Sequence, residues 1–212
     1  MTKPIKSYVD CITKEEYIYN MLRLEGISVK KESMPFVLRR ISTNDVKPSD
    51  IPKIDNILKG FSYSITSEHL FSYKEICRIN SIVDYGRDDC SEGKLRKEQI
   101  SITGTHWKPP IPNEMQVKEH IDAIINLSDH IKRAVELMLY LMKAQLFCDG
   151  NKRTAQLFSA ELLKSHSLVI SIPFCIQRDF CNLLIKYYED ENSENEIKDF
   201  IYTKAIFERR DF

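Results

Sequence analysis

The sequence predicts a single, mostly helical domain with one β-hairpin. Apolar residues recur at helical spacing through most of the 212 residues, and only Ile100–Ile102 alternates in the manner of a strand. The run from 135 to 146 is so apolar that it leaves little solvent face, which indicates a buried central helix. A chain of this length can form one well-buried core but not two domains of ordinary size.

The first half contains three predicted helices. Thr13-Lys14-Glu15-Glu16 forms a capping box, and the helix that it begins ends at Glu25-Gly26, where glycine suits a left-handed C-cap. Residues 27–46 show no clear period and predict a loop or an extended arm. A short helix follows Pro48 and stops at Gly60, and Ser72-x-x-Glu75 begins another that ends before Gly86.

The second half begins with the hairpin and continues with helices. Asn113 caps the first of these, and the buried central helix runs from about Asp129 to Leu146. Further helices are predicted after the turn at 147–153, around 176–187 and around 197–206, with an apolar link at 168–173.

Composition excludes several classes of function. Lys plus Arg equal Asp plus Glu at 31 each, so no net field attracts nucleic acid or an anionic membrane. No apolar run approaches the roughly 20 residues of a membrane span. Six cysteines without a Cys-x-x-Cys pair or a secretory leader indicate reduced thiols, and the five histidines make no zinc-ligand spacing. We therefore expect a cytoplasmic protein that binds neither nucleic acid nor membrane.

The turn Phe147–Arg153 lies between two buried helices and carries an acid, a glycine, an amide and two cations. If Asn151 caps the second helix, the amides of its first turn face the contents of the turn. Lys152 and Arg153 add positive charge there, and Asp149 is suited to a divalent cation beside a phosphate chain. These features predict a phosphate-binding turn. The alternative is an ordinary surface turn with solvated charges.

The segment Gln145–Ala155 resembles the signature loop of the Fic family, including its Doc-like branch, whose pattern is His-x-Phe-x-Asp/Glu-Gly-Asn-Gly/Lys-Arg. Most members transfer AMP from ATP to a hydroxyl of a target protein. The resemblance implies an all-α Fic-type fold with one β-hairpin flap and ATP and Mg²⁺ as ligands. It assigns the metal to Asp149 and the nucleotide to Gly150, Asn151, Lys152 and Arg153.

Two positions depart from the family pattern. Gln145 stands at the position of the catalytic histidine, and a neutral amide cannot accept a proton as an imidazole does. Gln156 stands where the fuller pattern has its last arginine. His106, close to the hairpin, either replaces the missing base or is a partly exposed hairpin histidine.

A second resemblance lies upstream of the loop. Gly93-Lys94-Leu95-Arg96, Ile100-x-Ile102-x-Gly104 and Pro109-Pro110 resemble the family's flap, a hairpin that pairs with an extended segment of the target protein. It assigns target docking to Ile100, Ser101, Ile102, Thr103 and Gly104. The alternative is a purely structural hairpin.

Glu25-Gly26 resembles the family's inhibitory element, whose glutamate reaches into the nucleotide site. We expect residues 1–30 to form an N-terminal segment with this inhibitory helix and residues 31–212 to form the Fic (Fido) domain. A Glu25–Gln156 hydrogen bond would substitute for the family's ion pair. The alternative is that Glu25 is solvated, and the resemblance leaves open whether it acts within one chain or across a homodimer.

Three hypotheses for function remain open at this stage. The first is a protein adenylyltransferase impaired by Gln145 and held off by Glu25, since loss of a general base typically costs roughly 10²–10⁴-fold in rate. The second is a pseudoenzyme that binds nucleotide and peptide without turnover. In the third, Gln145 was introduced to inactivate an active family member. Phosphate transfer is a further option, because Lys152 occupies a position that is glycine in most AMP transferases.

Overall fold

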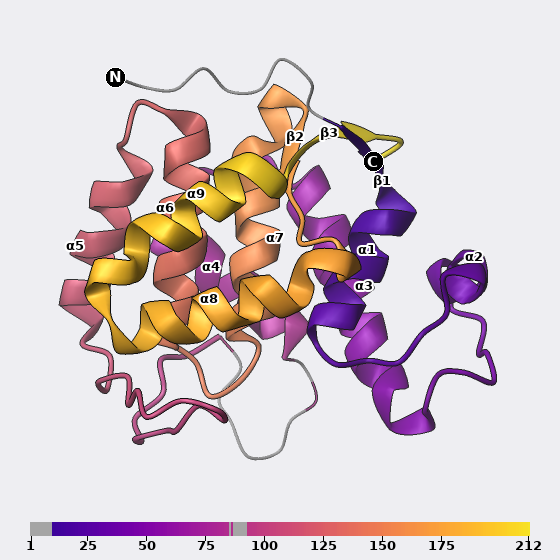
Figure 1. Cartoon of the computed structure of the whole chain (residues 1–212), viewed down its shortest axis with the longest axis horizontal. Coiled ribbons are helices and arrows are strands. Elements are labelled where there is room, and N and C mark those ends of the chain that lie inside the picture. The colour runs from indigo at the N-terminus through magenta and orange to yellow at the C-terminus, as the bar shows by residue number, and fades with distance from the viewer. Residues whose placement is uncertain (1–9, 85, 87–92) are drawn as a thin grey trace.

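Figure 1 shows the computed structural model, which describes residues 10–84, 86 and 93–212. The described chain is mostly helical, as predicted, and it also contains a small three-stranded sheet that was not predicted. Its helices are α1 (Lys14–Leu24), α2 (Met34–Leu38), α3 (Ile51–Thr66), α4 (Tyr73–Val83), α5 (Glu114–Ile125), α6 (His130–Ala144), α7 (Asn151–Leu163), α8 (Gln177–Glu189) and α9 (Glu194–Lys204). None of these helices is long and apolar enough to cross a membrane.

Helices α6 and α7 form the centre of the fold. They pack against each other along their length, and α7 also contacts α3 and α4, so that nearly all of its residues are buried. Helices α8 and α9 lie across α6 and α7 (Figure 1). A largely buried ion pair between Lys198 and Glu136 joins α9 to α6. The turn between α6 and α7 is therefore held on a rigid scaffold.

Helix α1 begins as predicted. Thr13 Oγ1 accepts a hydrogen bond from the Glu16 amide, and the Glu16 side chain reaches back to the Thr13 amide, which completes the capping box. Tyr17, fully buried, donates its hydroxyl hydrogen to the Gln156 carbonyl on α7 at 3.2 Å. Helix α1 thus shares the core of the remaining helices, and its first turn is bound to α7.

Gly60 does not end a helix. Helix α3 continues to Thr66, and a Cβ at position 60 would lie 2.7 Å from Leu157 on α7 and 2.7 Å from Val83 on α4. The glycine permits close packing of three helices, and this is why its role as a terminator was predicted wrongly.

Two segments that were expected to be irregular contain regular structure. The predicted arm at 27–46 includes α2, preceded by a 3₁₀ turn at Lys31–Ser33. The predicted link at 168–173 begins with β2 (Leu168–Ile170), which pairs antiparallel with β3 (Ile206–Arg210). β3 in turn pairs parallel with β1 (Cys11–Thr13), so the strand order is β1-β3-β2. This sheet closes the core beside α1, and its strands were too short to be recognised.

The predicted hairpin is an extended loop. Residues 98–110, hereafter the flap segment, contain no strand, although they do turn at Thr103-Gly104. The strand predicted at Ile100–Ile102 has no ladder partner within the described chain, and an unpaired strand is not stable alone. The segment is held instead by side chains, as described below.

Candidate functional site

The turn between α6 and α7 is built on two left-handed residues. Gln145 ends α6 with φ 47°, and Gly150 precedes α7 with φ 76°. A Cβ at Gly150 would lie 3.0 Å from the Asn80 side chain, so the position requires glycine. Asn80 Nδ2 also donates to the Asp149 carbonyl at 3.0 Å, which binds the turn to α4.

Asn151 does not cap α7, contrary to the prediction. Gly150 occupies the N-cap position without a side-chain cap, and Asn151 is the first helical residue. The Asn151 side chain accepts from the Phe147 amide at 3.0 Å and donates to the Phe147 carbonyl at 2.8 Å. It therefore ties the turn together internally. Because no side chain caps α7, the amides of its first turn can receive an anion.

Gln145 uses both ends of its amide inside the protein. Nε2 donates to the Met142 carbonyl at 2.7 Å, and Oε1 accepts from Asn151 Nδ2 at 3.1 Å. These two bonds use one N–H of Nε2 and one lone pair of Oε1. The side chain thus stabilises the turn, and it supplies no base.

Arg153 is buried among acidic side chains, with 3% of its side chain exposed. Nε lies 3.2 Å from Glu25 Oε2, and Nη2 lies 3.0 Å from Asp149 Oδ2 and 3.9 Å from Asp84 Oδ1. Nη1 donates to the Val83 carbonyl at 2.5 Å. This guanidinium therefore joins α1, α4 and the turn.

Glu25 lies at the end of α1 and points toward the turn between α6 and α7. Only 9% of its side chain is exposed, and Oε1 is 3.6 Å from Lys152 Nζ. The predicted hydrogen bond to Gln156 is absent, because Gln156 Nε2 donates to the Lys152 carbonyl instead. The solvated alternative is also wrong. Contacts between a carboxylate and a cation are stronger than a hydrogen bond between a carboxylate and a neutral amide. This explains why Glu25 contacts Arg153 and Lys152 and not Gln156.

A cavity of about 330 Å³ opens over the turn, at the lower end of the range for small-molecule sites. It brings together Glu25, Gln145, the turn residues 148–152 and two flap residues, Ile102 and Thr103. Among the predicted site residues, Arg153, Ile100, Ser101 and Gly104 do not line it. Helix α8 forms a further wall of the cavity that was not predicted from the sequence, and its lining residues are Cys181, Leu184, Ile185 and Tyr188.

Two carboxylate residues, Glu25 and Asp149, line this cavity, and Asp149 is the candidate metal ligand because it belongs to the turn. Its Oδ1 accepts from the Gly150 amide at 2.7 Å, and Oδ2 contacts Arg153. Mg²⁺ is commonly held by one or two carboxylates together with substrate phosphates, and this donor set fits that pattern. Across residues 10–84, 86 and 93–212 there is no group of three or more His, Cys, Asp or Glu side chains placed to hold a metal ion.

The flap segment is attached to two helices beside the cavity. Trp107 Nε1 donates to the Lys143 carbonyl of α6 at 3.3 Å. Glu189 of α8 accepts from the His106 amide at 2.7 Å and from Thr105 Oγ1 at 2.9 Å, and these bonds lower the pKa of its carboxyl. His106 is exposed and does not line the cavity, so its position favours the exposed hairpin histidine over the replacement base.

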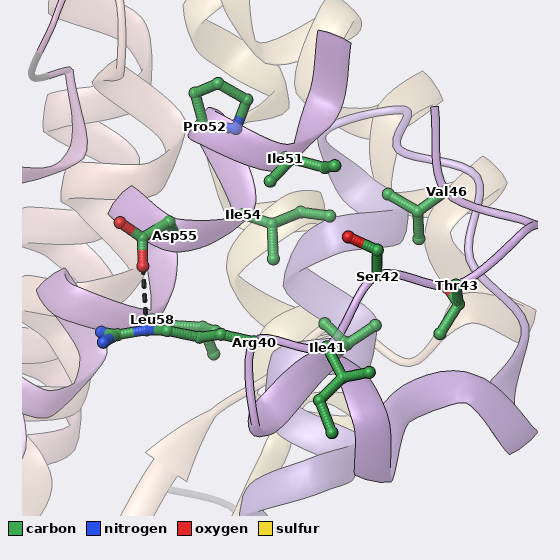
Figure 2. A pocket seen from close by; sticks show the side chains of 11 residues that line it. Arg40, Ile41, Ser42, Thr43, Val46, Ile51, Pro52, Ile54, Asp55 and Leu58 are labelled. Carbon is green, nitrogen blue, oxygen red and sulfur yellow. Dashed lines mark ion pairs between the residues drawn. The ribbon is translucent and has the colours of Figure 1, made fainter. Parts of the chain in front are cut away.

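A second cavity, of about 260 Å³, lies between α3 and the loop after α2 (Figure 2). Arg40 and Asp55 form an ion pair at 2.9 Å on its edge, and its walls are largely aliphatic, including Ile41 and Ile54. None of the predicted site residues lines it.

The segment that contains the turn matches a known protein family. Residues 70–163 match the Fic/DOC family model. This segment runs from just before α4 to the end of α7, so it contains the flap segment, Gln145 and the whole turn. No curated protein sequence matches the chain.

Solved Fic structures share the fold. A Fic domain containing signaling protein from Bacteroides thetaiotaomicron superposes with a TM-score of 0.72 at 17% identity over 89% of this chain and 80% of that one. Fic-1 (residues 134–508) from C. elegans gives 0.67 at 19% identity over 88% of this chain, which spans only 62% of that one. BepC from Bartonella tribocorum, with bound AMPPNP, gives 0.51 at 11% identity over 73% and 84%.

Proposed function

We propose that this chain is a Fic-family protein that binds ATP with Mg²⁺ over the turn between α6 and α7, and that its transfer of AMP to protein hydroxyls is impaired by Gln145 and restrained by Glu25. The observation that carries the proposal is the Glu25 carboxylate, which lines the cavity and is paired with Lys152, which also lines it, and with the buried Arg153. The proposed partner is a target protein docked as an extended segment along the flap. The balanced charge, together with the free thiols of the cysteines in the described residues, favours a cytoplasmic location.

Three features of the cavity support nucleotide binding. The uncapped start of α7 presents amides that suit phosphate oxygens, and Lys152 adds a partly exposed cation at the same place. Asp149 would hold Mg²⁺, which neutralises phosphate charge. The relative from Bartonella was solved with an ATP analogue, although its identity to this chain is only 11%.

Glu25 restrains the site because it competes with phosphate for the same cations. With Glu25 in place, Arg153 is surrounded by carboxylates and Lys152 also donates to the Leu24 carbonyl at 3.1 Å. A bound triphosphate would bring further negative charge against Glu25 at close range. The contact lies within one chain, so we propose that the restraint acts without a second subunit.

AMP transfer requires the target hydroxyl oxygen to attack the α-phosphorus while the bond to the leaving diphosphate breaks in line. This chain would hold the phosphates and align the hydroxyl with the flap segment. The hydroxyl proton would have to pass to solvent, because the Gln145 amide cannot take it. We therefore expect this chain to transfer AMP slowly.

A second candidate is a pseudoenzyme that binds nucleotide and peptide without turnover. It is favoured by the hydrogen bonds of Gln145 to Met142 and Asn151, which give the amide a stabilising role in the turn.

Intact-mass spectrometry after incubation with ATP and Mg²⁺ tests the proposal. We expect an AMP-sized adduct to accumulate slowly on the Glu25→Gly variant and much faster when Gln145→His is added. An adduct only in the presence of Gln145→His would select the pseudoenzyme. No adduct on either variant, together with no saturable ATP binding, would overturn the proposal.

A further inference from the structure

Arg96 is buried at the junction between the flap segment and the turn, with 2% of the residue exposed. Its guanidinium donates to backbone carbonyls of three separate stretches of chain. The acceptors are Gln145 at 2.6 Å from Nε, Glu98 at 2.7 Å from Nη1, and Pro109 at 3.0 Å and Pro110 at 2.5 Å from Nη2. The Arg96 amide also donates to the Leu146 carbonyl at 3.0 Å.

The geometry suits a guanidinium and no other side chain. A planar fork can donate in several directions at once, whereas the ammonium of lysine is a compact charge on a flexible stem. Burial of a cation is unfavourable unless hydrogen bonds replace its water, and burial accordingly lowers the pKa of Arg96. The hydrogen bonds of Arg96 offset the unfavourable burial of its charge at the point where the flap segment meets the turn.

The contacts of Arg96 join both limbs of the flap segment to the turn. Glu98 lies on the outgoing limb, and Pro109 and Pro110 lie on the returning limb, which Gln99 also contacts through a 2.8 Å bond to the Pro109 carbonyl. The Gln145 carbonyl belongs to the residue whose side chain lines the cavity.

We propose that Arg96 is a positioning residue: it fixes the flap segment against the backbone of Gln145 and so sets where a docked target hydroxyl lies relative to the nucleotide. This inference rests on the function proposed above. Trp107 and Glu189 attach the far part of the flap segment to α6 and α8, whereas Arg96 connects its base directly to the turn.

The test compares Arg96→Met and Arg96→Lys in a background that carries Glu25→Gly and Gln145→His. Arg133→Met is the matched control, because the Arg133 guanidinium also donates to a backbone carbonyl, that of Leu127, but away from the cavity. The measurements are the initial rate of AMP incorporation into the chain by intact mass, the dissociation constant for ATP, and hydrogen exchange of the flap segment.

We expect Arg96→Met to lower the rate of AMP incorporation at least tenfold while the ATP dissociation constant changes less than twofold. Arg96→Lys should fall between the background and Arg96→Met, because it keeps the charge and loses the fork. If Arg96→Met does not fold, the lysine variant carries the comparison. Exchange should rise in residues 98–110 more than in α9, and Arg133→Met should change neither rate nor exchange there.

An unchanged rate, an equal loss in Arg133→Met, or a parallel loss of ATP affinity would overturn the inference. If the background binds no ATP, the proposed function has failed, and hydrogen exchange still decides the role of Arg96. Faster exchange confined to residues 98–110 and the turn would support its positioning role, and uniform or unchanged exchange would refute it.

Discussion

Glu161 should make the stability of this fold depend on pH. It lies on α7 with no exposed surface, and neither of its carboxylate oxygens has a hydrogen-bond partner in the described part of the chain. Burial and the nearby carboxylate of Glu75 on α4 raise its pKa to about 7, and Lys164 and Ser67 only partly offset them. In the same cluster, Ser67 Oγ donates a hydrogen bond to Glu75 Oε1 at 3.3 Å.

The change in unfolding free energy with pH follows from the difference in the pKa of Glu161 between the folded and unfolded states. A rise from the ordinary value of 4.5 to about 7 corresponds to about 3 kcal/mol, at roughly 1.4 kcal/mol per pKa unit. The folded state holds the proton more tightly than the unfolded state. This stabilisation is therefore complete below pH 4.5 and is lost as the pH rises through 7.

Glu161→Gln should remove this dependence, because glutamine keeps the shape of the protonated acid and stays neutral. Urea denaturation between pH 4.5 and 8.5 measures the difference in unfolding free energy between the variant and the parent chain. We expect a difference close to zero at the acid end and a gain of up to about 3 kcal/mol above pH 8. Glu119→Gln, on the exposed face of α5, is the control. A difference for Glu161→Gln that does not vary with pH would refute the reasoning.

Two further predictions concern the core and the cavity. Gly60→Ala should destabilise the fold by about 1–3 kcal/mol, because its Cβ would meet Leu157 and Val83, although alanine ordinarily favours a helix. Thermal unfolding checks this, with Ser62→Ala on the exposed face of α3 as control, and an unchanged Tm would contradict it. Asp149→Asn should abolish the dependence of ATP affinity on Mg²⁺, measured by calorimetry with Mg²⁺ or with a chelator, whereas a retained dependence would place the metal elsewhere.

Local signals in the sequence predicted most helix starts. The capping box at Thr13, the Ser72 cap and the Asn113 cap each form as expected, because their hydrogen bonds lie within one turn of helix. Gly60 shows the limit of this reasoning. From the sequence alone, a glycine at this position predicts the end of a helix. The packing of α3 on α4 and α7 shows instead that Gly60 lets the three helices approach one another closely.

The candidate site was predicted in part. The turn, Glu25 and two flap residues do meet at one cavity. The conformation of the turn depends on residues close together in the chain, and such local structure can be predicted from a short motif. The partner of Glu25 was wrong, since the choice between Gln156 and Arg153 depends on how α1 packs against α7. The α8 wall and the Arg96 contacts join residues that are far apart in the chain. The local sequence around these residues contains no pattern that predicts such contacts.

The central claim is that Glu25 occupies a nucleotide site. Calorimetric titration of ATP with Mg²⁺ into the parent chain and into Glu25→Gly tests it most directly, because binding does not require the missing base. We expect saturable binding to both chains, with at least tenfold higher affinity for the variant, which equals about 1.4 kcal/mol. This lies within the range for one charge-assisted interaction. Equal affinities would contradict the restraint by Glu25, and no binding to either chain would contradict the nucleotide site itself.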